Sequence, residues 1–479
     1  MSDLAYLSAT SIARMIKRRE ISSREAVDYF LARVASLDKP INSVVTVDPA
    51  RARAEADAAD TALARGEARG ALHGVPMTIK DSFQTAGMRT TSGAPELARF
   101  IPQEDAWPVA RLRAAGAVIF GKTNLPIYAG DIQSYNQVFG TTNNPHDLSR
   151  TPGGSSGGAA AALACGFTPL ELGSDIGGSI RVPAHMSGVA GHKPSYGIVP
   201  AHGQIPGPPG TLTLADLAVA GPMARTVEDL KLALGIMSGP DRWNHPAWRL
   251  KLPAPRRRRL KEYRIAAWLD DPACAVEPGV TELLENAVSA LASGGARIDF
   301  DARPAFTLAK VADTFFALLQ AALSGGVPAE RLDEYAAETG DSPAAQSRRQ
   351  TAMRHRNWLS YNERRLQMRK RWEEFFTDWD AILLPVMPCG AIPHDHSEPM
   401  ASRTVSVGGE TRPYWNLTTW MAPAGACYLP ATVVPVGKLK DGLPIGIQIV
   451  GPYLHDHTTL ALAGHLLAIL GRCPQPPGF

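Results

Sequence analysis

The chain has 479 residues, of which 45% are hydrophobic, so it can bury a large core. A formal net charge of +3 is too small to indicate binding to nucleic acid or to a membrane surface, and it favours a small or uncharged substrate. The N-terminus lacks the apolar stretch of a secretory signal, no run reaches the roughly 18 apolar residues of a membrane span, and the five cysteines show no paired spacing. We therefore expect a cytoplasmic protein with reduced thiols.

The first 65 residues are predicted to form a helical segment. Apolar residues recur there at helical spacing, and serines near positions 8 and 22 are plausible N-caps for two helices. A third helix should follow Pro49 and end near Gly66. We expect this N-terminal segment, residues 1–65, to pack on a larger α/β domain formed by residues 66–479.

Short apolar runs separated by glycine, proline and helical stretches dominate the rest of the chain. This pattern predicts an α/β fold with a large mixed, mostly parallel central sheet flanked by helices. Residues 305–376 are predicted to form a mainly helical cap region, and the Pro/Gly-rich loop at 201–215 is placed at a pocket rim. The strand candidates are residues 75–79, 117–120, 169–172, 265–268, 381–384, 431–435 and 445–450.

Two glycine-rich turns that carry serines lie between Thr151 and Pro183. The first, residues 153–158, surrounds Ser155 with almost no side-chain bulk, so its backbone can turn sharply and expose hydroxyls and amides. Residues 159–164 then predict a short, tightly packed helix. In the second turn, residues 175–179, successive N–H groups can point into one concavity and hold a developing oxyanion. Ser179 is therefore the predicted nucleophile.

A serine needs a base at neutral pH, and Lys80 is the nearest upstream candidate. Residues 75–79 predict a short buried strand, which would leave the Lys80 ammonium close to the protein interior. Desolvation lowers a lysine pKa from about 10.4 by several units, enough to make a neutral base. Ser155 can then relay the proton between Lys80 and Ser179.

In these motifs the chain resembles the amidase signature hydrolases. The resemblance covers nearly the whole sequence through the segments 72–81, 121–124, 151–183, 221–226 and 444–448, and the family's serine pair is spaced as Ser155 and Ser179 are. It implies the amidase signature fold, Lys80 as base, Ser155 as a bridging serine on a cis peptide bond, and an acyl-enzyme on Ser179. The oxyanion hole implied by the resemblance consists of the backbone N–H groups of Ile176, Gly177, Gly178 and Ser179.

The resemblance in these segments also implies which residues surround the substrate. The acyl side should be approached by Tyr128, Ala129, Gly130 and Asp131, and by Gln133 with the two residues that follow it, Ser134 and Tyr135. The rim loop around residues 204–210 should face the leaving group. Three further residues are predicted only to support the second turn: Ser174, Asp175 and Arg181.

Together these residues predict a serine hydrolase that cleaves the C–N bond of small uncharged linear amides or carbamates (urethanes). A Ser–cisSer–Lys triad would form a covalent acyl-enzyme, with no cofactor and no metal. The resemblance also includes the A subunit of the glutamyl-tRNA(Gln)-type amidotransferase, which needs a partner protein and tRNA and is the first alternative. A homodimer is a further expectation, although no interface is indicated, and neither the acyl chain nor the preference between amides and carbamates follows from the sequence.

Other motifs support competing interpretations. Residues 153–157 fit the G-x-S-x-G elbow of α/β-hydrolase esterases, with His185, His192 or His202 as base, but a turn-forming stretch precedes them instead of a strand. Residues 116–123 match a P-loop, yet their apolar positions predict a strand. The H-x-H pairs at 394–396 and 455–457 lack a third metal ligand at a diagnostic spacing. A non-enzymatic scaffold is disfavoured by the intact Lys–Ser–Ser set.

Overall fold

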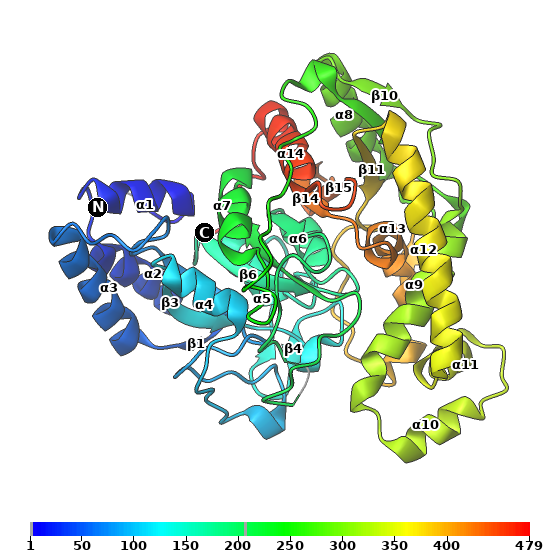
Figure 1. Ribbon diagram of the computed structural model, residues 1–479, viewed down its shortest axis with the longest axis horizontal. Coiled ribbons are helices and arrows are strands. Elements are labelled where there is room, and N and C mark those ends of the chain that lie inside the picture. The colour runs from blue at the N-terminus through cyan, green and yellow to red at the C-terminus, as the bar shows by residue number, and fades with distance from the viewer. Residues whose placement is uncertain (1–2, 206–207) are drawn as a thin grey trace.

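A computed structural model describes residues 3–205 and 208–479, so Pro206 and Gly207 of the predicted rim loop lie outside the described residues. An 11-stranded sheet runs through the molecule in the order β1-β3-β2-β6-β8-β7-β14-β15-β11-β9-β10 (Figure 1). Its strands are β1 (Val44–Val47), β2 (Pro76–Lys80), β3 (Val118–Thr123), β6 (Leu170–Asp175), β7 (Ala190–Lys193), β8 (Val219–Ala224), β9 (Arg264–Ala267), β10 (Arg297–Asp299), β11 (Ala381–Pro385), β14 (Ala431–Lys438) and β15 (Pro444–Val450).

The large mixed sheet confirms the predicted α/β fold, but the expectation that it is mostly parallel is wrong. Parallel pairs occur at β3–β2–β6 and at β11–β9–β10. The strands between these groups, from β6 through β8, β7, β14 and β15 to β11, pair antiparallel, as does β1 with β3. The difference arises because β7 and β8 were not predicted from the sequence, and because β14 and β15 form a hairpin that needs no crossover helix.

The three predicted N-terminal helices are present as α1 (Ala9–Lys17), α2 (Ser23–Leu37) and α3 (Pro49–Ala64). The Ser8 hydroxyl caps α1 by accepting the backbone N–H of Ser11. Ser22 and Glu25 form a reciprocal capping box at the start of α2. Proline at the first position of α3 suits a helix start, because its missing N–H would have no intrahelical partner there.

Two hydrophobic clusters cover the opposite faces of the sheet. Alternate residues of β11 divide between them, with Ala381 and Leu383 in one cluster and Ile382 and Leu384 in the other. The first cluster is covered by α1–α3, α4 (Trp107–Ala114), α7 (Val227–Met237), α8 (Pro278–Ser293) and α14 (Asp456–Leu470). The second is covered by α6 (Arg181–Ser187), α9 (Leu308–Leu323), α12 (His355–Asp378) and α13 (Ala422–Ala426), while α5 (Gly157–Ala164) contributes to both.

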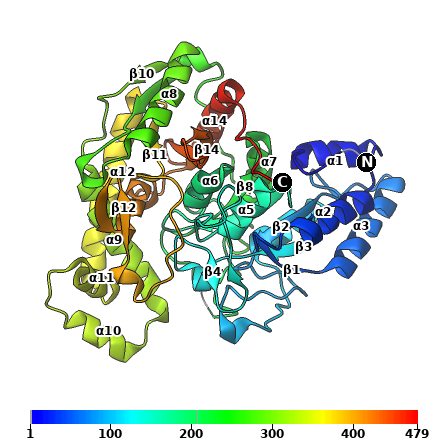
Figure 2. The same ribbon diagram turned by 180° about the vertical axis from the view of Figure 1, so that it is seen from behind.

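The predicted cap region is helical and lies at the end of the molecule away from α1–α3 (Figures 1 and 2). It contains α9, α10 (Ala329–Ala336), α11 (Pro343–Thr351) and α12, and α9 packs against α11, α12 and α13. Two small hairpins lie outside the main sheet: β4 (Tyr135–Asn136) with β5 (Gly140–Thr141), and β12 (Thr404–Val407) with β13 (Glu410–Pro413). Among the described residues, no helix has both the length and the apolar character needed to cross a membrane.

Candidate active site

Lys80 lies at the end of β2, an entirely buried strand that runs parallel to its neighbours β3 and β6. Its Nζ lies 2.7 Å from Ser155 Oγ, 2.9 Å from Ser156 Oγ and 3.0 Å from Ser174 Oγ. All three partners are hydroxyls, which can donate a proton to a neutral amine as well as accept one from an ammonium. The structure therefore brings Lys80 and Ser155 together as the sequence predicted.

The environment of Lys80 favours the neutral amine. Burial lowers the pKa of Lys80 to about 7, although the carboxyl groups of Asp175 and Glu171 act in the opposite direction. Burial also raises the pKa of Glu171 to about 8, so this neighbouring carboxyl is largely uncharged at pH 7. By contrast, the buried Lys193 donates to two backbone carbonyl oxygens, which cannot give a proton back, and the buried Lys122 lies beside the Asp81 carboxyl group and also donates to the Phe83 carbonyl oxygen. Lys80 is thus suited to accept a proton.

The loop that carries Ser155 is held by very close backbone packing. Ser155 follows a cis peptide bond after Gly154, and α5 begins two residues later at Gly157. A Cβ at Gly154 would lie 2.7 Å from backbone atoms of Asp131, Ile132 and Gln133, so only glycine fits there. This loop meets the second turn through the Ser156 N–H, which donates to the Ser179 carbonyl oxygen at 3.1 Å.

The second turn is organised around the buried carboxylate of Asp175. Arg181 donates to it from Nε at 3.0 Å and from Nη2 at 2.9 Å, and both side chains are fully buried. Although burial alone would raise the pKa of Asp175, the Arg181 guanidinium holds it below its ordinary value. The carboxylate also accepts the backbone N–H groups of Gly178, Ile180 and Arg181. The structural role predicted for this ion pair matches these contacts.

This carboxylate changes the set of candidate oxyanion donors. The Gly178 N–H donates to Asp175 Oδ1 at 3.0 Å, so we remove Gly178 from the predicted oxyanion hole. Glycine is still required at position 178, because the φ angle of Gly178 is +114° and a Cβ built there would lie 2.8 Å from Met421 Sδ. Three candidate oxyanion donors remain on this turn, the backbone N–H groups of Ile176, Gly177 and Ser179. Ile176 and Gly177 are half-buried, and Ser179 is 7% exposed.

The predicted acyl-side residues separate into two groups. Tyr128, Ala129 and Gly130 lie in or just after a short 3-10 helix, η2 (Ile127–Ala129), and remain half-buried or exposed. Asp131 and Gln133 are instead buried, and their side chains are hydrogen-bonded to residues between Asp395 and Tyr414, so contact of these two residues with a substrate stays a prediction. The family resemblance placed these two residues near the substrate, but it gave no information on their side-chain partners, which lie more than 260 residues later in the chain.

Two hydroxyls that contact Lys80 were missed or underestimated. Ser156 had no predicted role beside Lys80, and Ser174 was expected only to support the turn. A signal for Ser156 was present, because it follows Ser155 within the same glycine-rich turn. Ser174 lies near the end of β6, the strand beside β2, and only this pairing brings it to the lysine.

The competing motifs are used structurally. His185 bonds to Gly446 and to the Cys389 carbonyl oxygen, His192 bonds to Thr432 and Asp456, and His202 packs between Trp107 and Trp243. The P-loop-like segment forms the buried strand β3, as its apolar positions predicted. Across residues 3–205 and 208–479, no group of three or more His, Cys, Asp or Glu side chains gathers in a way that could hold a metal ion.

Comparisons with known proteins agree with this geometry. A family model described as Amidase matches residues 25–460. The chain is 33% identical over 487 residues to the A subunit of the glutamyl-tRNA(Gln) amidotransferase of Roseiflexus castenholzii, covering 96% of this chain and 95% of that protein. A bacterial aryl acylamidase of the amidase signature enzymes is similar in structure, with a TM-score of 0.81 at 26% identity over 98% of this chain and 97% of that one. A 6-aminohexanoate cyclic dimer hydrolase, solved with its substrate, gives a TM-score of 0.79 at 25% identity over 99% of each chain.

Proposed function

Because the chain belongs to the amidase signature family, we propose that it is a cytoplasmic serine hydrolase that cleaves C–N bonds of small uncharged amides or carbamates through an acyl-enzyme on Ser179. The observation that carries the proposal is the fully buried Lys80, whose amine is surrounded by three serine hydroxyls within 3.0 Å. A buried lysine held by hydroxyls, with its pKa lowered to about 7, has the properties of a general base.

In the proposed reaction, Ser179 Oγ attacks the carbonyl carbon while its proton passes through the Ser155 hydroxyl to the neutral amine of Lys80. The amide N–H groups of Ile176, Gly177 and Ser179 would stabilise the negative charge on the carbonyl oxygen. Ser155 then returns the proton to the nitrogen as the C–N bond breaks. Water repeats the attack on the acyl-enzyme, which releases the acid and restores Ser179.

Apolar side chains beside the second turn support an uncharged substrate. The nearest atom to a Cβ built at Gly177 is Cδ2 of Leu319 on α9, and Met421 lies against Gly178. The charged side chains on and near the turn, Asp175 and Arg181, are paired with each other. Two structural relatives are named for the hydrolysis of an aryl amide and of a cyclic amide, which supports amides as the substrate class.

A second candidate function is the A subunit of a glutamyl-tRNA(Gln)-type amidotransferase. Identity of 33% over 96% of the chain to such a protein supports this candidate more directly than it supports activity on carbamates. The same acyl-enzyme chemistry on Ser179 would then release ammonia from glutamine, in an assembly with a partner protein and tRNA.

The experiment that separates these candidates uses the purified chain alone. Hydrolysis of 4-nitroacetanilide or a 4-nitrophenyl carbamate, lost in Ser179→Ala, would support the stand-alone hydrolase. Glutaminase activity that appears only with partner subunits would support the second candidate. If Ser179→Ala retained full activity in either assay, the proposed nucleophile would be wrong. Light scattering on the same preparation tests the expected homodimer.

A further inference from the structure

The segment Asp131–Ser134 packs against one side of the loop that carries Ser155 and is hydrogen-bonded to it. Ser134 Oγ donates to the Gly153 carbonyl oxygen at 3.0 Å and accepts the Gly157 N–H at 3.1 Å, so it bridges both ends of the loop. At Gly154 the segment's backbone lies so close that a Cβ would meet it at 2.7 Å. A displacement of this segment would therefore move the Ser155 loop as well.

The same segment is held on its other side by residues from much later in the chain. Arg403 Nη1 donates to Asp131 Oδ2 at 2.7 Å, and the Tyr414 hydroxyl donates to Asp131 Oδ1 at 2.5 Å. Gln133 donates to the Tyr414 oxygen at 3.0 Å and forms two further bonds with the backbone of Asp395. We call residues 393–414 the strap, because they bind two polar side chains of the segment, those of Asp131 and Gln133.

These contacts are buried, which makes their loss costly. The side chain of Asp131 is 1% exposed and that of Arg403 is fully buried, so removing Arg403 leaves the Asp131 charge without its ionic partner away from water, whereas Arg403 has a second ionic partner in Glu398. Arg403 also donates to the Tyr135 hydroxyl and to the Ser397 carbonyl oxygen, which ties the guanidinium to both the segment and the strap. Within the described residues, the hydrogen bonds of Arg403 and Tyr414 reach none of Lys80, Ser155 or Ser179, but they do reach the segment that packs on the Ser155 loop.

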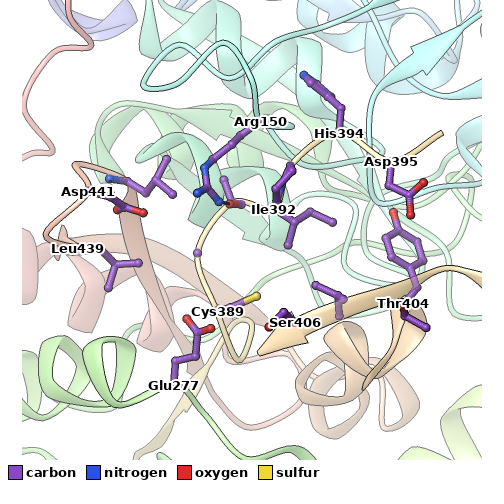
Figure 3. A pocket seen from close by; sticks show the side chains of 16 residues that line it. Arg150, Glu277, Cys389, Ile392, His394, Asp395, Thr404, Ser406, Leu439 and Asp441 are labelled. Carbon is purple, nitrogen blue, oxygen red and sulfur yellow. Dashed lines mark hydrogen bonds between the residues drawn. The ribbon is translucent and has the colours of Figure 1, made fainter. Parts of the chain in front are cut away.

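A cavity of about 390 Å³ lies beside the strap. Asp395, Thr404 and Tyr414 contribute to its lining, and Figure 3 shows Asp395 and Thr404 across the cavity from Glu277 and Asp441. Because this space flanks the strap, close packing does not fix the strap on that side. The hydrogen bonds to Asp131 and Gln133 therefore carry more of the positioning.

We propose that Arg403 and Tyr414 are positioning residues that set the place of Ser155 by holding the segment Asp131–Ser134 against the Ser155 loop. The inference rests on the proposed function of Ser155 as proton relay to Ser179. It assigns Asp131 and Gln133 a part in catalysis that involves no contact with the substrate. Small displacements of reacting groups are enough for a large effect, because a shift of about 1 Å can cost about a hundredfold in rate.

The test compares Arg403→Gln, Arg403→Lys and Tyr414→Phe with the control Arg412→Gln. Arg412 also lies in the strap, on β13. It forms an ion pair with Glu410 and donates to the Ala275 carbonyl oxygen, whereas Arg403 binds Asp131. The probe is a fluorophosphonate, for which the maximal rate of labelling and the half-saturating concentration are measured separately. Peptide mapping locates the adduct, and each variant's thermal unfolding midpoint is recorded so that rates are compared where all are folded.

We expect Arg403→Gln and Tyr414→Phe to lower the maximal labelling rate about tenfold or more, with the half-saturating concentration within about twofold of wild type. Arg403→Lys should recover part of the rate, and Arg412→Gln should label like wild type. If Arg403→Gln does not fold, Tyr414→Phe decides, because it removes a single hydroxyl.

Labelling of folded Tyr414→Phe at the rate of Arg412→Gln would overturn the inference while leaving the proposed function intact. A wild-type adduct on a residue other than Ser179 would instead refute the proposed function, and this inference with it.

Discussion

The proposed base gives a specific pH dependence. With its pKa lowered from 10.5 to about 7, Lys80 is about half neutral at pH 7, whereas a lysine with the ordinary value would be about 0.03% neutral. The burial of one side chain thus raises the population of the base by about a thousandfold. Because the neutral amine is the reactive form, labelling of Ser179 should be constant above about pH 8 and fall about tenfold per pH unit below about pH 6.

The assay is the second-order rate of fluorophosphonate labelling between pH 5 and 9. Lys80→Met should lower the rate at pH 8 by about 10² to 10⁴ and remove the dependence on pH, because no base of this pKa remains. Lys193→Met is the matched control, since burial lowers the pKa of Lys193 to about 7 as well, while among the residues that the structure describes its Nζ donates to the backbone carbonyl oxygens of Pro194 and Leu429. This control should keep the acid limb of the profile. If the limb disappeared in Lys193→Met and persisted in Lys80→Met, the assignment of the base would be refuted.

Three further changes test the surroundings of the site. Lys80→Met should stabilise the fold by up to about 4 kcal/mol at pH 7, and this gain should vanish near pH 10.5. Between pH 7 and pH 10.5 the folded wild type binds fewer protons than the unfolded chain, so the free energy of unfolding of the wild type rises with pH in this range. If the urea midpoint of the wild type stayed constant between pH 7 and pH 10.5, the lowered pKa of Lys80 would be contradicted. Asp175→Asn should cost about 3–5 kcal/mol in urea unfolding, because the Arg181 charge stays buried without its partner, and a loss below about 1 kcal/mol would argue against the pair's role. Gly154→Ala should abolish labelling of Ser179, whereas Gly235→Ala on α7, with open space around it, should label like wild type; equal rates in both would show that the close packing is unimportant.

The reactive residues of the candidate site were easier to predict from the sequence than the residues that hold them in place. The glycine-rich turns around Ser155 and Ser179 and the short apolar run before Lys80 are local patterns, and local patterns determine strands and turns. The contacts of Ser174 and Asp131 depend on which strands pair and on partners hundreds of residues away, which spacing alone does not encode.

The sheet shows the same division. Apolar runs predicted the strands β2, β3 and β11, whereas the glycine- and proline-containing strands β7 and β8 carry little strand propensity and form through their neighbours. Missing them produced the wrong expectation of a mostly parallel sheet. The division into a segment 1–65 and a domain 66–479 with a helical cap stays a prediction, which limited proteolysis would test.

The most direct test of the central claim is the position of the covalent adduct. Intact-protein mass spectrometry after fluorophosphonate treatment, followed by peptide mapping, should find one adduct on Ser179 in the wild type and at most a trace in Lys80→Met. An adduct on Ser155 or Ser156 that forms equally well in Lys80→Met would contradict the account, because neither the nucleophile nor the base would then be the residue that the geometry indicates.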